Sequence, residues 1–125
     1  MISEVLHNKN RYHLVVVTST IPPTTTEKVV RSLIEKISGK KVGEDIGLCF
    51  MPEFLREGTA IQDILNPWRI VVGEFDRKSG NILHQFLLDV HSGKLPPIVR
   101  TAPVNAELIN MRACISIWKR VCQQI

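Results

Sequence analysis

The 125-residue sequence predicts an α/β fold built on a three-layer, mostly parallel sheet and followed by a long C-terminal helix. Three short apolar runs, at 14–17, 48–51 and 70–72, have the pattern of strands that are buried on both faces of a sheet. Between them, apolar residues recur at helical spacing. Because strands that alternate with helices usually pair in parallel, we expect helices to cover the sheet's faces.

The first unit begins with the strand at 14–17, which is expected to end at Thr18–Thr20. Ile21-Pro22-Pro23 then predicts an extended exit, because a residue before proline avoids the helical region. The spacing from Thr24 to Glu27 is that of a capping box, which predicts the start of a helix. Gly39 is the expected end of that helix.

The second strand, at 48–51, precedes a polar segment and a short predicted helix at 59–65, which Asn66-Pro67 ends. A third strand at 70–73 follows, and Asp76–Ser79 is expected to cap the next helix. The apolar face of that helix comprises Ile82, Leu83, Phe86, Leu87 and Val90. A further short strand at 96–100 is expected to be peripheral, because its prolines donate no ladder hydrogen bond.

The last segment carries apolar residues that alternate at spacings of four and three. They are Val104, Leu108, Met111, Ile115, Trp118, Cys122 and Ile125. This pattern predicts one helix about 33 Å long. Such a stripe usually packs on its own core, and pairing with a second copy of the chain is the sharper alternative. We therefore predict a homo-oligomer, most simply a dimer, joined through 104–125.

Composition narrows the classes of function. The net charge of +4 is scattered rather than clustered, which argues against a nucleic-acid surface. No apolar run approaches the roughly 20 residues that cross a membrane, and the polar start lacks a signal-peptide core, so a cytoplasmic location is expected. Cys49, Cys114 and Cys122 show no metal-ligand spacing and the histidines form no ligand set, which predicts reduced thiols and no metal.

Two carboxylates, Glu53 and Glu57, lie four residues apart directly after the second predicted strand. Open α/β sheets bind their ligands at the carboxyl ends of strands, so this segment is a candidate site. On composition alone, a solvated turn is the favoured interpretation, because glutamates are mostly exposed.

The order of residues in this segment indicates more than its composition. Pro52–Ala60, followed by Asp63 and by Asn66-Pro67-x-Arg69, resembles the signature of the UDP-glucose/GDP-mannose dehydrogenase family. Ser19–Pro23 matches that family's second motif at the expected distance upstream. The similarity runs from about 14 to 109 and corresponds to a middle portion of the family's chain.

This resemblance implies a partial NAD-binding, Rossmann-like domain over 1–103 and the start of a central, dimerising helix over 104–125. Members oxidise the C6 hydroxymethyl group of a nucleotide sugar to a carboxylate, using two NAD+ and a catalytic cysteine. By the same resemblance, Thr20 would lie beside the nicotinamide and hold a catalytic water, and Glu53 would be the general base.

The remaining family roles fall on neighbours of these two residues. Ser19 and Ile21 would flank Thr20 on the cofactor side, and Glu57 would lie where sugar and cofactor meet. The substrate-binding set implied by the family is Glu53, Phe54, Leu55, Arg56 and Glu57.

The sequence also departs from the family pattern. It contains no Gly-x-Gly-x-x-Gly turn to cradle a pyrophosphate, and the family's cysteine nucleophile is expected downstream of these residues. Asn110 and Cys114 occupy the positions of a catalytic lysine and asparagine, and an amide cannot supply the lysine's positive charge. Thr24 replaces the usual glycine after Pro-Pro, and Trp68 replaces the usual aspartate.

We therefore expect a truncated member of the family, inactive on its own, whose intact relatives oxidise UDP-glucose to UDP-glucuronate. Gly58-Thr59-Ala60 and Asn66-Pro67-x-Arg69 favour UDP-glucose over GDP-mannose. The alternative is a non-catalytic interaction protein that dimerises or that completes a separately encoded partner.

Overall fold

The computed structural model of the chain describes residues 2–9, 11–54 and 58–122. The strands are β1 (His13–Val17), β2 (Ile46–Phe50), β3 (Ile70–Glu74) and β4 (Ile98–Thr101). The helices are α1 (Ile2–His7), the π-helix η1 (Thr26–Val30) with α2 (Arg31–Ser38), α3 (Ala60–Leu65), α4 (Arg77–Val90) and α5 (Pro103–Cys122). The predicted alternation of strands and helices is confirmed, and α1 is an element that the sequence patterns did not indicate.

The four strands form one sheet in the order β1-β2-β3-β4. The outer pairs, β1 with β2 and β3 with β4, are parallel, as expected for βαβ units whose helices are α2 and α4. The central pair is antiparallel and joins only Cys49 to Glu74 and Phe50 to Gly73. The sheet is thus mostly parallel, as predicted, with one reversal. The reversal arises where α3 buries none of its residues and does not form a packed crossover.

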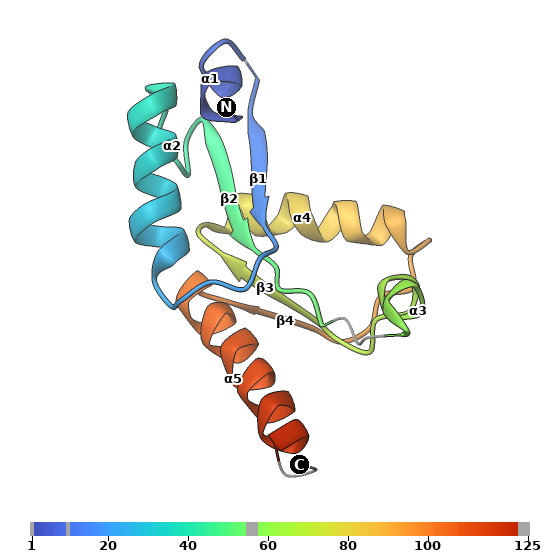
Figure 1. Ribbon diagram of the computed structural model, residues 1–125. Helices are drawn as coiled ribbons and strands as arrows, with labels where there is room; N and C mark the ends of the chain where they lie inside the picture. Colours follow the sequence, from blue (N-terminus) through green and yellow to red (C-terminus); the bar gives the residue numbers. More distant parts are fainter. Residues whose placement is uncertain (1, 10, 55–57, 123–125) are drawn as a thin grey trace.

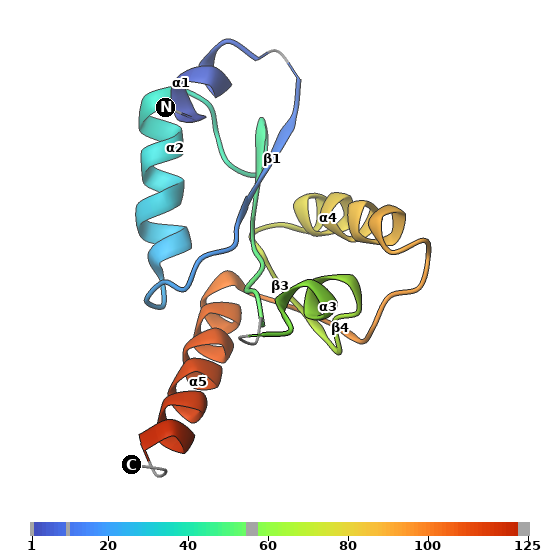
Figure 2. The ribbon, with the colours of Figure 1, turned by 45° about the vertical axis from the view of Figure 1, so that its right-hand side comes forward.

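Helices cover both faces of the sheet, which gives the predicted three layers (Figures 1 and 2). On one face, Leu83 and Leu87 of α4 pack against Cys49 and Val72. The other face carries the α2 cluster and the α5 cluster. The buried members of these two clusters are Leu6, Ile34, Val42, Ile46 and Leu48 for the first, and Phe50, Val71 and Ala106 for the second.

The start of α5 lies directly on β3 at Gly73. A Cβ added at Gly73 would lie 2.7 Å from the Cα of Pro103 and 2.9 Å from the Cβ of Ala106. Only glycine leaves room for this contact, because real Cβ atoms do not approach other atoms so closely. The helix then runs away from the sheet toward the C-terminus, as both views show.

Local signals for helix ends are partly confirmed. Gly39 ends α2 in the left-handed conformation, with φ of 69°, and donates its N–H to Glu35 O. Asp76 caps α4 by accepting a hydrogen bond from the Ser79 N–H at 2.9 Å. The predicted capping box from Thr24 to Glu27 is wrong, because no side-chain cap forms at the start of η1.

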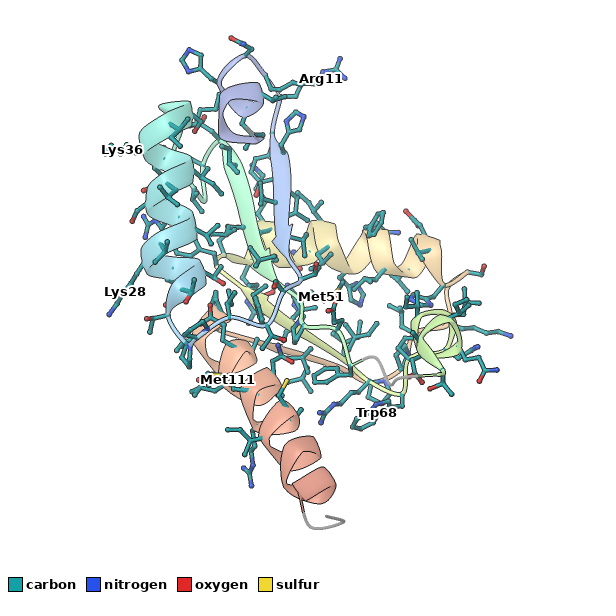
Figure 3. The ribbon with its side chains drawn as sticks, viewed as in Figure 1. Arg11, Lys28, Lys36, Met51, Trp68 and Met111 are labelled. Carbon is teal, nitrogen blue, oxygen red and sulfur yellow. The ribbon has the colours of Figure 1, made fainter. Side chains whose placement is uncertain are left out.

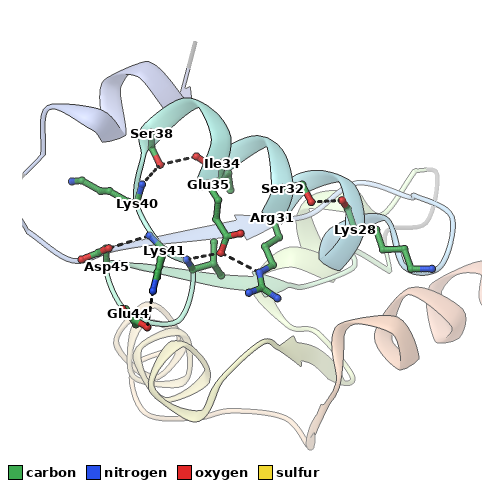
Figure 4. Close-up of polar contacts among 11 residues, drawn as sticks. Lys28, Arg31, Ser32, Ile34, Glu35, Ser38, Lys40, Lys41, Glu44 and Asp45 are labelled. Carbon is green, nitrogen blue, oxygen red and sulfur yellow. Dashed lines mark hydrogen bonds and ion pairs between the residues drawn. The ribbon is translucent and has the colours of Figure 1, made fainter.

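The loop after α2 is tied back to the helix by Glu35 (Figure 4). Its Oε1 accepts hydrogen bonds from the backbone N–H of Val42 and from Arg31 Nε, each at 3.1 Å. The Val42 N–H, and after it Arg31, lowers the pKa of the Glu35 carboxyl below its usual value. These contacts fix the entry into β2, and β2 in turn positions the candidate site.

Candidate functional site

The carboxyl ends of β1 and β2 meet at one edge of the sheet. Val17 pairs with Phe50, and the N–H of Met51 donates to Val17 O at 2.8 Å. The segments that follow the two strands therefore leave the sheet side by side. Ile21 from the first and Phe54 from the second both pack on the α5 cluster. Residues from both sequence motifs thus pack on the same cluster.

Thr20 lies on this edge with its side chain exposed, as does its neighbour Ser19. The Nδ2 of Asn110 donates a hydrogen bond to Thr20 Oγ1 at 3.2 Å, and Asn110 is itself 2% exposed. The structure thus joins two residues that sequence reasoning singled out separately. By the family resemblance, this amide would occupy the position of a lysine, and the hydroxyl that it contacts is the one expected to take part in catalysis.

Glu107 is the residue of this region that sequence reasoning missed. It is fully buried, and its carboxylate accepts two backbone hydrogen bonds from the turn after the proline pair. The N–H of Thr24 donates to Oε2 at 2.5 Å and that of Thr26 donates to Oε1 at 2.8 Å. A glutamate from α5 therefore satisfies the Thr24 N–H, which the predicted capping box would also have satisfied, and with it the Thr26 N–H. The only sequence signal was an acid inside the apolar run 106–109.

The turn that Glu107 holds has an unusual backbone at Thr24. Its φ is 72°, in the left-handed region that glycine adopts freely and a β-branched residue adopts rarely. A non-glycine residue there costs roughly 1–2 kcal/mol. This conformation gives a physical reason for the glycine that the family usually has at this position.

Glu53 and Phe54 leave β2 in a different direction. Pro52 is buried, whereas Glu53 is exposed. Glu53 and Phe54 line a groove of about 550 Å³ that α3 and α4 complete, and Thr20 does not line it. Thr20 and Glu53, the predicted catalytic pair, thus lie on the same edge of the sheet without sharing a described cavity. Three predicted substrate residues, Leu55, Arg56 and Glu57, lie outside the described residues.

Of the two described cysteines, one is buried in the sheet and the other is exposed on α5. Cys49 is buried near the carboxyl end of β2, and its burial, with Asp76 and Glu74 nearby, raises its pKa to about 12. It is therefore a protonated, unreactive thiol at neutral pH. Cys114 is exposed on α5, one turn after Asn110. Over 2–9, 11–54 and 58–122, no group of three His, Cys, Asp or Glu side chains could hold a metal ion.

The position of Ser19 and Thr20 suits a nucleotide cofactor. Their exposed hydroxyls lie at the carboxyl end of a parallel strand pair, the edge at which open α/β sheets bind nucleotides. Within the part of the chain that the structure describes, no helix is long and apolar enough to cross a membrane.

Comparison with protein families decides the classification. The model of the UDP-glucose/GDP-mannose dehydrogenase family, NAD binding domain, matches residues 1–89. The chain belongs to this family. The match confirms the predicted family and the predicted Rossmann-like, NAD-binding type of fold.

Individual relatives include both substrate types. GDP-mannose 6-dehydrogenase of Pseudomonas syringae pv. tomato is 44% identical over 117 residues, which are 94% of this chain and 25% of that protein. UDP-glucose 6-dehydrogenase AglM of Haloferax volcanii is 42% identical over 109 residues, 86% of this chain and 25% of that protein. The chain thus spans about a quarter of the length of these relatives. An aligned stretch of 117 residues must include 9–117, so similarity continues beyond the limit at 109 that the motifs indicated.

Solved structures give the same result. A ternary complex of GDP-mannose dehydrogenase from Pseudomonas aeruginosa superposes with a TM-score of 0.86 at 38% identity, covering 96% of this chain and 27% of that one. A UDP-glucose dehydrogenase from Pyrobaculum islandicum has a TM-score of 0.73 at 39% identity, covering 86% and 23%. The family is therefore established, and the identities do not separate the two nucleotide sugars.

Proposed function

We propose that these residues form the part of an NAD-dependent nucleotide-sugar 6-dehydrogenase that presents Thr20 to the cofactor and Glu53 to the sugar. The observation that carries the proposal is the contact from Asn110 on α5 to the Thr20 hydroxyl. It joins the family's cofactor motif to the helix position at which the family has a catalytic lysine.

Each residue then has a chemical task. Ser19, Thr20 and Ile21 would hold NAD, which supplies a hydride acceptor for the alcohol carbon. Glu53 would take the proton from the sugar hydroxyl, and its carboxylate is accessible from the groove. Phe54, with Leu55, Arg56 and Glu57, would contact the nucleotide sugar.

Asn110 limits what this arrangement can do. Its neutral amide orients the Thr20 hydroxyl but cannot neutralise an oxyanion, and the loss of one such stabilising group costs about 10²–10³ in rate. The 125 residues also lack a glycine-rich pyrophosphate turn. We therefore propose that the chain by itself binds NAD weakly and does not turn over.

NMR titration of the labelled chain with NAD tests this function. We expect weak binding, above micromolar, with shifts of the Ser19, Thr20 and Ile21 amides that diminish in Thr20→Val. Ser32→Ala, on the exposed side of α2, is the control and should leave the titration unchanged. Absence of shifts in this segment at millimolar NAD contradicts the proposal. Steady NADH production that is lost on Glu53→Gln would show instead that the chain is active.

For the sugar nucleotide, the motifs at 58–60 and 66–69 support UDP-glucose. The higher TM-score of the GDP-mannose dehydrogenase structure, 0.86 against 0.73, favours GDP-mannose as the second candidate. Parallel titrations with the two compounds compare them directly, because both would shift the same segment after β2 and differ in affinity.

We also propose a dimer joined through α5. Such a dimer is compatible with an enzyme and with the alternative, a non-catalytic interaction protein. The face of α5 that packs on the sheet carries Ala106 and Asn110, whereas Leu108 and Ile115 of the predicted stripe are 50% and 52% exposed. The side chain of Trp118 lies outside the described residues. In analytical ultracentrifugation, we expect a dimer that Met111→Glu weakens, and a monomer at tens of micromolar would contradict it.

A further inference from the structure

An open pocket of about 360 Å³ lies near the amino ends of β1 and β2, whereas Thr20 follows the carboxyl end of β1. Because the two strands are parallel and His13 pairs with Ile46, the segments that precede them meet at one edge of the sheet. The first turn of α4 reaches the same edge. Figure 3 shows Arg11 at this end of the strands and Met51, which follows β2, at the other. None of the described candidate residues for NAD or the sugar lines this pocket.

Four cationic side chains line the pocket: Lys9, Arg11, Lys40 and Lys78. The Nζ of Lys40 donates a hydrogen bond to the backbone carbonyl of Lys9, which joins the loop after α2 to the segment before β1. In the described part of the chain, none of the four forms an ion pair with an acid. Like charges that are gathered at one site repel one another, so a bound anion would stabilise this arrangement.

The two acids that line the pocket, Glu44 and Asp45, both contact Lys41, which does not line it. The Oδ2 of Asp45 accepts a hydrogen bond from the Lys41 N–H at 3.0 Å, and the Oε1 of Glu44 lies 3.9 Å from Lys41 Nζ. Figure 4 shows both acids turned toward Lys41. The pocket therefore keeps an excess of positive charge.

Lys78 is held over the aromatic ring of Tyr12, with its Nζ 3.7 Å from the ring centre. The Tyr12 hydroxyl donates to the buried Ser79 hydroxyl at 3.0 Å, which in turn donates to Asp76 Oδ2 at 2.5 Å. A Cβ added at Gly47 would lie 2.6 Å from the Tyr12 oxygen and 2.8 Å from Ser79 Oγ, so a larger residue there would displace this pair. Packing beneath the pocket thus fixes one of its cations before any ligand binds.

We propose that this pocket binds a small, multiply charged phosphate anion, of which free diphosphate is the simplest. Lysine and arginine side chains donate charge-assisted hydrogen bonds to phosphate oxygens. The described residues that line the pocket all end in a charged or polar group, so the pocket offers no apolar wall to an organic body. The site does not depend on the function proposed above, because it lies at the other end of β1 from Thr20.

NMR titrations of the labelled 125-residue chain with pyrophosphate and with inorganic phosphate test the proposal. We expect shifts of the Arg11, Tyr12 and Lys78 amides. Pyrophosphate should bind about tenfold more tightly than phosphate, since its second phosphoryl group accepts further hydrogen bonds from the cations. The two titrations are run at equal ionic strength so that screening is the same in both. Equal affinities, or pyrophosphate shifts that map elsewhere, overturn the proposal.

Two variants that each remove one positive charge separate this pocket from the general attraction of a basic chain for anions. Lys78→Gln should weaken pyrophosphate binding about tenfold. Lys28→Gln is the matched control, because Lys28 is exposed and does not line the pocket, and its affinity should stay within about twofold of the wild type. Equal losses in the two variants would show non-specific attraction and overturn the proposal. If Lys78→Gln fails to fold, Arg11→Gln takes its place with the same expected loss.

A further titration with ADP distinguishes a free diphosphate from one that belongs to a nucleotide. ADP should shift the pocket amides no more tightly than pyrophosphate does, because its nucleoside meets no apolar wall. Binding of ADP that is tighter by about tenfold or more would overturn the assignment to a free anion.

Saturating pyrophosphate should leave the NAD titration at Thr20 unchanged, because the two sites lie at opposite ends of β1. Loss of the NAD shifts at Thr20 on addition of pyrophosphate would overturn the assignment of a separate site. Failure of NAD to bind at Thr20 in the absence of pyrophosphate contradicts the proposed function alone and leaves the result for the pocket intact.

Discussion

Two segments leave the same edge of the sheet, and they are held in opposite ways. The segment after β1 is joined to α5 by hydrogen bonds to two buried side chains, two to Glu107 at 2.5 and 2.8 Å and one from Asn110 at 3.2 Å. The segment after β2 leads into a groove whose contacts are aromatic and cationic, with Trp68 63% exposed. Both segments carry a family motif. The segment after β1 is held in place by hydrogen bonds, whereas the segment after β2 borders a groove that is open to solvent.

The difference shows what fixes a loop. Apolar contacts are present at both segments, because Ile21 and Phe54 pack on the same cluster. Among the residues that the structure describes, only the first segment has a buried carboxylate that accepts hydrogen bonds from its backbone N–H groups. Directional hydrogen bonds to a buried carboxylate set the path of the backbone, whereas apolar contacts tolerate small displacements.

The largest effect is expected for Glu107→Ala, which removes the carboxylate that holds the segment after β1. It leaves the buried Thr26 N–H and the half-buried Thr24 N–H without their acceptor, and each such group costs roughly 1–3 kcal/mol, so we expect a loss of about 3 kcal/mol in the free energy of unfolding. Urea denaturation measures it. Glu44→Ala is the control, because the Glu44 side chain is 71% exposed and should change stability by less than about 0.5 kcal/mol. A loss below about 1 kcal/mol for Glu107→Ala would show that water replaces the carboxylate.

A second variant should strengthen the fixed segment. Thr24→Gly relieves the left-handed backbone and keeps the N–H that donates to Glu107. We expect a gain of about 1 kcal/mol after the entropy cost of glycine is deducted. Thr25→Gly, at φ of −63°, provides the comparison and should be destabilising. If both variants lower the melting temperature, strain at Thr24 is not the reason for the family's glycine.

The smallest effect is expected at the groove, which Trp68 lines. Trp68→Asp restores the family's usual residue at a position that is 63% exposed. The ring's contacts to Arg69 and Phe54 contribute about 0.5 kcal/mol at such a site, so the unfolding free energy should change by no more than that. Thermal unfolding at neutral pH measures the change. A loss above about 2 kcal/mol would place Trp68 in a buried contact, for example between two copies of the chain.

Features that depend on neighbouring residues could be predicted from the sequence. Gly39 and Asp76 end and begin helices through contacts within four residues, and the patterns identified both. The Glu107 contacts could not be predicted, because they join residues 81 and 83 positions apart. The predicted capping box was a local alternative, because it too would have paired the backbone N–H of Thr24 with a glutamate carboxylate, that of Glu27. The sequence pattern alone does not distinguish Glu27 from Glu107 as the acceptor.

The direction of strand pairing was also beyond local reasoning. The apolar run of β3 has the same sequence pattern whether the strand pairs parallel or antiparallel with β2. The pairing is antiparallel here, and α3, which connects the two strands, buries none of its residues. For α5, periodicity identified an apolar stripe but not the face that packs. The close contact between Gly73 and Ala106 turns the small-residue face inward and leaves Leu108 outside.

The reach of Glu107 also bears on how the protein is made. A chain leaves the ribosome from its N-terminus at about 5–20 residues per second. Thr24 therefore emerges several seconds before the carboxylate that will accept its N–H. Over that interval the turn after Pro22-Pro23 has no acceptor to hold its left-handed backbone, and it can be fixed only when α5 has been synthesised. The segment after β1, though encoded early, therefore reaches its final shape only after a helix that is encoded some eighty residues later.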